Sequence, residues 1–108
     1  MGLINATIRV GMLASQKMDL EYKIMVITQA QMNLSQSVQD LMQVGTDYTD
    51  PDSQAAKILK QREARLQQVE KRLVMQMEQY KTRLKAIETE LESAKGMRDK
   101  CVESTFKY

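Results

Sequence analysis

The feature of this sequence that most constrains its fold is one long helical pattern, which runs from Pro51 to about Phe106. Apolar residues recur there at steps of three and four, as they do along one face of an α-helix. At 1.5 Å per residue, such a helix would be on the order of 80 Å long. A stripe of that length cannot be buried inside a 108-residue globule. The helix therefore needs a partner along most of its length.

The segment from Leu3 to Val44 is the internal candidate for that partner, because it carries a heptad repeat of its own. The repeat positions are Leu3, Ala6, Val10, Leu13, Lys17, Leu20, Ile24, Ile27, Gln31, Leu34, Val38 and Leu41. Ten of these twelve are apolar, which favours a coiled coil. A plain core-facing helix is the alternative. The polar Lys17 and Gln31 are expected to fix the register of the pairing.

The long second pattern has matching positions. They are Leu59, Arg62, Leu66, Val69, Leu73, Met77, Tyr80, Leu84, Ile87, Leu91, Ala94, Arg98, Cys101 and Thr105. Two consecutive steps of four, from Val69 through Leu73 to Met77, predict a stutter that relaxes the supercoil. Gly96 lies inside this helix and weakens it by about 1 kcal/mol relative to alanine.

The two patterns are separated by a break at residues 45–53. Gly45 suits the position after a helix end, and Asp50 followed by Pro51 suits a helix start. We therefore predict a single all-α domain over 1–108, an antiparallel two-helix hairpin (coiled coil) whose second helix is longer than the first. Its expected parts are helix 3–44, loop 45–50 and helix 51–106. One kinked rod is the alternative.

The predicted hairpin has two kinds of apolar surface. The seam between the helices is expected at Leu13, Leu20, Ile24, Ile27, Leu34, Leu41, Leu66, Leu73, Tyr80, Leu84, Ile87 and Leu91. Further apolar residues lie off this seam, where one partner helix cannot cover them, and we interpret them as a self-assembly interface. They are Ile4, Ile8, Met18, Met25, Val26, Met32, Phe106 and Tyr108. The alternative is that loose packing tolerates these methionines.

The composition offers no chemistry. Histidine is absent and Cys101 is the single cysteine, so we expect no catalytic residues, no metal site and no cofactor. The net charge of +2 is too small to indicate nucleic acid, and acidic residues interrupt the basic ones of the second helix. No signal peptide and no transmembrane segment is expected.

Three short runs resemble bacterial axial proteins. The run from Thr49 to Ala56 (TDPDSQAA) and the run from Glu103 to Tyr108 (ESTFKY) are similar in layout to the needle subunits of type III secretion systems. The opening residues Met1 to Asn5 (MGLIN) resemble those of flagellin-like proteins. This resemblance implies a helical-hairpin filament subunit that is exported without a cleaved signal and polymerises through both terminal segments.

Taken together, these patterns predict a non-enzymatic structural subunit that assembles with copies of itself into a bundle, tube or filament. Its expected location is a cell-surface or extracellular filament, and otherwise the cytoplasm. The alternative is a coiled-coil adaptor or chaperone of an export apparatus, which would use the same apolar face to hold a partner from that apparatus.

Overall fold

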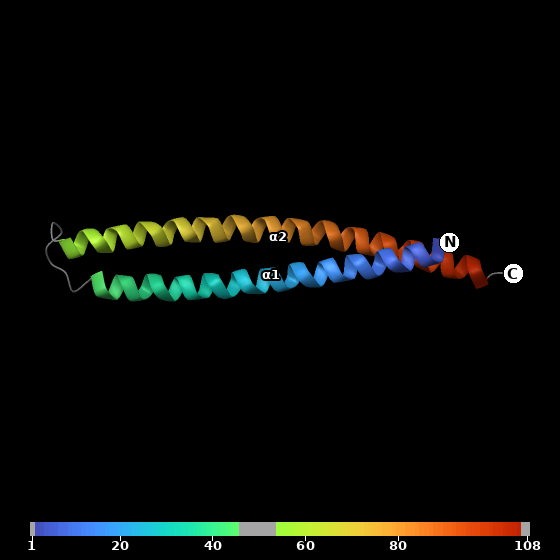
Figure 1. Cartoon of the computed structure of the whole chain (residues 1–108), viewed down its shortest axis with the longest axis horizontal. Coiled ribbons are helices and arrows are strands. Elements are labelled where there is room, and N and C mark those ends of the chain that lie inside the picture. Colours follow the sequence, from blue (N-terminus) through green and yellow to red (C-terminus); the bar gives the residue numbers. More distant parts are fainter. Residues whose placement is uncertain (1, 46–53, 107–108) are drawn as a thin grey trace. The chain divides into compact units, whose positions relative to one another are not determined.

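The structure is a computed structural model that describes residues 2–45 and 54–106. These residues form two α-helices, α1 from Gly2 to Gly45 and α2 from Gln54 to Phe106 (Figure 1). α1 has 44 residues and α2 has 53. Gly45, the first residue of the expected loop, is the last residue of α1. The rest of that loop, with the predicted helix start at Asp50 and Pro51, lies outside the described residues.

Both helices consist largely of residues that favour a helix, and the chain's one proline lies in neither of them. Side chains one turn apart add local contacts. Lys23 Nζ lies 3.0 Å from Asp19 Oδ2, and Thr7 Oγ1 donates a 2.8 Å hydrogen bond to the Leu3 carbonyl. An ion pair one turn apart contributes only about 0.2–0.5 kcal/mol, and a threonine bond to the preceding turn does not stabilise a helix. Most of the stability of the helices must therefore come from packing against each other.

The contacts divide the chain into two compact units. The first, here called the terminal unit, joins Met1–Ile24 with Gln79–Tyr108, and the second, the central unit, is Met25–Glu78. Each unit contains one part of α1 and one part of α2.

In the terminal unit the two helices run antiparallel. A Cβ built on Gly2 would lie 3.2 Å from Cys101 Sγ. Farther along α1, Lys17 Nζ lies 4.0 Å from Glu88 Oε1, and Lys23 Nζ lies 5.8 Å from the centre of the Tyr80 ring. Residues farther along α1 thus contact residues that come earlier in α2, and this is the order of contacts between antiparallel helices. Figure 1 shows the start of α1 beside the end of α2.

The central unit has the same order. Gln31 and Val74 line one hollow between the helices, and Leu41 and Leu66 line another nearer the ends of the described helices. In both units, therefore, the pairing is that of an antiparallel two-helix hairpin. The predicted fold class, with its longer second helix, is confirmed.

The buried core is concentrated in the terminal unit. Val10 and Leu13 of α1 pack there with Leu91 and Ala94 of α2, and Ala14 and Ile87 border them. Leu20 is buried in the same unit. Among the described residues of the central unit, Ile27 is the buried one. The two units therefore differ in how closely their helices pack.

Candidate assembly interface

The residues expected in the seam all lie on the sides of the helices that are shielded from solvent. The buried ones are Leu13, Leu20, Ile27 and Leu91. The half-buried ones are Ile24, Leu34, Leu41, Leu66, Leu73, Tyr80, Leu84 and Ile87. All twelve repeat positions of α1 are buried or half-buried, including the polar Lys17 and Gln31. The pairing thus uses the same stripe in each unit.

Three positions of the α2 repeat are exposed instead, which corrects the sequence pattern at Arg62, Val69 and Thr105. Val69 is apolar but keeps 39% of its surface open. Between Leu59 and Leu73, Leu66 is consequently the one shielded position of α2. Each seven-residue repeat of a coiled coil normally places two side chains in the seam. This part of α2 places only one there, which leaves space between the helices.

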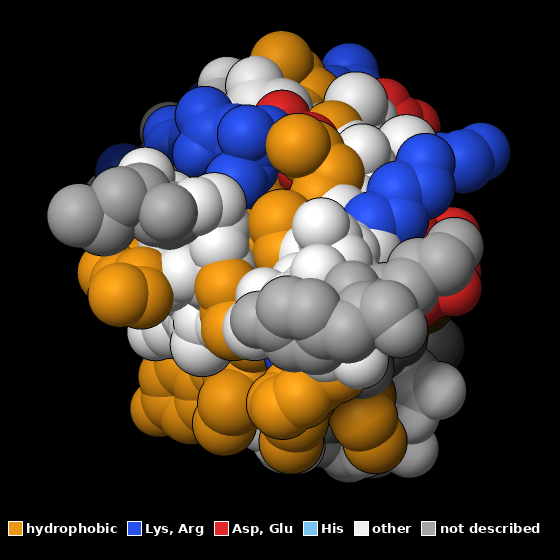
Figure 2. All heavy atoms as spheres, turned by 90° about the vertical axis from the view of Figure 1, so that its right-hand side faces the viewer, with side chains coloured by type: hydrophobic (Ala, Val, Ile, Leu, Met, Phe, Trp, Pro, Cys, Tyr) orange, Lys and Arg blue, Asp and Glu red, His pale blue; other side chains and the backbone are white. Residues whose placement is uncertain are grey.

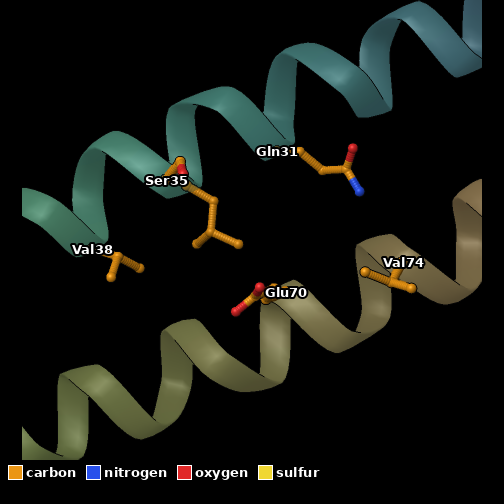
Figure 3. Close-up of a pocket in the computed structure, with 6 residues that line it drawn as sticks. Gln31, Ser35, Val38, Glu70 and Val74 are labelled. Carbon is orange, nitrogen blue, oxygen red and sulfur yellow. The ribbon is translucent and has the colours of Figure 1, made fainter.

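That space takes the form of hollows in the central unit. One of about 270 Å³ is lined by Leu34 and by the residues labelled in Figure 3, which are Gln31, Ser35, Val38, Glu70 and Val74. In the close-up Glu70 and Val74 come from α2, and the other labelled residues come from α1. This hollow is a groove at the surface of the helix pair and not an enclosed void. These hollows are therefore open surface that another chain could fill.

The side of α1 that faces away from the seam is exposed and apolar in both units. Ile4, Ile8 and Met18 belong to the terminal unit, and Met25, Val26 and Met32 belong to the central unit. Met18 is 71% exposed, Met25 is 69% and Met32 is 62%. In neither unit does α2 cover these side chains.

The last turns of α2 are also exposed to solvent. Cys101 faces Gly2, the first described residue of α1, so the residues that follow Cys101 lie beyond the end of that helix. Figure 1 shows these last turns of α2 extending past α1, and Phe106 is 77% exposed. Figure 2, which views this end of the molecule, shows hydrophobic side chains open to solvent. Tyr108 lies outside the described residues.

The polar seam residue Lys17 has carboxylates within reach on both helices. Its Nζ lies 3.9 Å from Glu21 Oε1 on α1 and 4.0 Å from Glu88 Oε1 on α2. The side chain of Lys17 is 36% exposed, so solvent screens both pairs and their net contribution to stability is small. That Lys17 fixes the register of the pairing stays a prediction.

The sequence patterns did not identify some of the exposed apolar residues. Met12 and Tyr22 on α1 and Met75 and Met97 on α2 are each more than half exposed. Tyr22 lies four residues after Met18, on the same side of α1, so helical spacing could have identified it. Met97 lies between Gly96 and Arg98 and carries no repeating signal, whereas Met75 lies within the largely apolar run from Leu73 to Met77, off the seam column.

None of the described segments is long and apolar enough to cross a membrane. Within the same segments, no group of three or more His, Cys, Asp or Glu side chains could hold a metal ion. No known protein family, curated protein or solved structure matches this chain. The exposed surface of the described helices is therefore the basis for inferring a function.

Proposed function

We propose that this protein is a structural subunit that assembles with copies of itself through the exposed apolar side of α1. The observation that supports the proposal is the exposure of Met18, Met25 and Met32, which α2 leaves uncovered. Apolar residues that recur on the outer side of a helix, rather than singly, mark a surface that binds another protein.

The charges of α1 avoid part of that side, although the heptad column of Met12 and Val26 also carries Asp19 and Asp40. The described charged residues of α1 are Arg9, Lys17, Asp19, Glu21, Lys23 and Asp40. The two heptad columns that run through Met18 and Tyr22 contain none of them. The outer side of a helix in a soluble monomer usually carries its charged residues. The two uncharged columns would not add to the desolvation penalty of burying ions against a neighbouring chain.

The direct test is the size of the purified protein across a range of concentrations. The wild type should form large species that grow with concentration in light scattering and appear as bundles, tubes or filaments in negative stain. Met25→Glu should raise the concentration needed for assembly about tenfold or more, because a carboxylate would have to be buried against a neighbour. Gln68→Glu is the matched control, since Gln68 is an exposed residue of α2.

A wild type that stays monomeric or dimeric at all concentrations would overturn the proposal. If such a protein enlarged only when a protein of an export apparatus was added, the same apolar side would belong to an adaptor. Equal loss of assembly in Met25→Glu and Gln68→Glu would show that net charge, and not the apolar side of α1, controls association.

A further inference from the structure

The two sides of the helix pair in the central unit carry opposite charges. A hollow of about 460 Å³ lies on one side, where Arg62 and Arg65 line it together with Ser37 and Val44. A hollow of about 310 Å³ lies on the other side, where Glu63 and Glu70 line it together with Val38 and Met42. Leu41 and Leu66 form the floor of both. We call these the arginine side and the glutamate side.

Helical geometry explains why the two hollows lie on opposite sides of the seam. In α2, Arg62 and Glu63 are consecutive, and they flank the seam column of Leu59 and Leu66 on its two sides. In α1, Ser37 and Val44 lie on one side of the seam, and Met42 lies on the other. The glutamate side continues into the hollow of Figure 3, which Glu70 also lines.

The charges on both sides are open to a partner. Arg62, Arg65, Glu63 and Glu70 are exposed, and none of them forms an ion pair with another residue of the described helices. One acidic group, Asp40, lines the arginine side, and its Oδ1 accepts a 3.1 Å hydrogen bond from Gln36 Nε2.

The glutamate side has no basic residue in its lining. The nearest bases along α2 are Lys60, three residues before Glu63, and Lys71, directly after Glu70, and neither of them lines the hollows there. The two sides therefore keep opposite signs next to the seam.

We propose that neighbouring copies of this chain dock side by side, with the arginine side of one copy against the glutamate side of the next. This inference rests on the proposed function and adds a second contact between copies to the one through the outer side of α1. Arginine and carboxylate groups match in charge and can form paired hydrogen bonds. Docking two equal sides would instead place arginine against arginine or glutamate against glutamate.

The hollows supply the apolar part of the same contact. Both have a leucine floor, and Met42 and Val44 beside them are 64% and 45% exposed. A side chain of the neighbouring copy that entered such a hollow would remove this apolar surface from water. Complementary charge thus determines which sides pair, and the burial of apolar surface stabilises the contact.

This pairing has a consequence for the size of the assembly. An arginine side that meets a glutamate side is a heterologous contact, so each added copy leaves one further side unpaired. Contacts of that kind produce rings when the rotation closes and open filaments when it does not. A contact between two equal sides would stop at a dimer.

Two charge-reversed variants test the inference. Arg62→Glu with Arg65→Glu makes both sides acidic, and Glu63→Arg with Glu70→Arg makes both sides basic. Neither variant should assemble alone, with the sedimented fraction reduced about tenfold or more by like-charge repulsion. An equal mixture of the two should assemble, since each acidic side then meets a basic one. The mixture also has the mean net charge of the wild type.

The matched control is Lys57→Glu with Lys71→Glu. This variant changes the net charge as much as the first does, but Lys57 and Lys71 are exposed and line none of the described hollows. It should assemble like the wild type. Circular dichroism checks that every variant remains helical.

The outcomes separate this inference from the proposed function. A wild type that assembles, while both reversed variants also assemble alone, overturns the docking scheme and leaves self-assembly standing. Helical variants that fail to assemble when mixed overturn the scheme as well. A wild type that does not assemble overturns both proposals.

Discussion

At the scale of single residues, Met25 and Ile27 show how sharply the environment changes along α1. Met25 is 69% exposed, whereas Ile27, two residues later, is 6% exposed. Two steps along a helix turn the side chain by about 200°, which takes it from the outer side to the seam. The same substitution at these two positions therefore separates assembly from folding.

We expect Ile27→Glu to destabilise the protein by about 3–5 kcal/mol, because an unpaired carboxylate would be buried in the seam. Met25→Glu should leave the helicity unchanged, since its side chain already lies in water. Thermal unfolding followed by circular dichroism measures both. Equal loss of helicity in the two variants would contradict the division of α1 into a seam and an outer side.

The residue scale also shows what the sequence could and could not predict. The heptad repeat placed all twelve of its α1 positions on the shielded side, because period alone decides which residues of a helix share a face. It placed Val69 in the α2 stripe as well, but Val69 is 39% exposed, because the period of a helix does not give the distance to the partner helix. Helical spacing also separates Arg62 from Glu63 across the column of Leu66, but the hollows beside Leu66 are visible only in the packed helices.

At the scale of elements, α2 is a continuous helix from Gln54 to Phe106 with Gly96 inside it. A Cβ built on Gly96 would meet no atom within 4 Å, so nothing in the described structure opposes a larger residue there. The glycine therefore weakens the helix without a packing role in the described residues.

Gly96→Ala should raise the free energy of unfolding by about 1 kcal/mol, because alanine has the higher helix propensity and restricts the unfolded chain. Chemical denaturation measures the change. Gly2→Ala is the matched control and should gain less, since its Cβ would lie 3.2 Å from Cys101 Sγ. A gain at Gly2 as large as that at Gly96 would show that the thiol moves aside freely.

At the scale of the whole molecule, the two units differ in packing. The terminal unit contains the cluster of Val10, Leu13, Leu91 and Ala94, whereas the central unit contains hollows beside Leu41 and Leu66. Local stability follows the density of buried apolar contacts. The central unit should therefore open more readily, although the same two helices run through both.

Hydrogen exchange at a concentration below assembly tests this difference within one helix. Backbone amides of α1 near Leu13 should exchange about tenfold or more slowly than those near Leu41, because opening the terminal unit exposes its buried cluster. Exchange near Leu41 should then slow when the protein assembles, since a neighbouring copy would fill the hollows on both sides of that residue. Equal rates before assembly would contradict the difference in packing. Unchanged rates near Leu41 after assembly would instead show that copies meet elsewhere, which would leave the outer side of α1 as the sole contact.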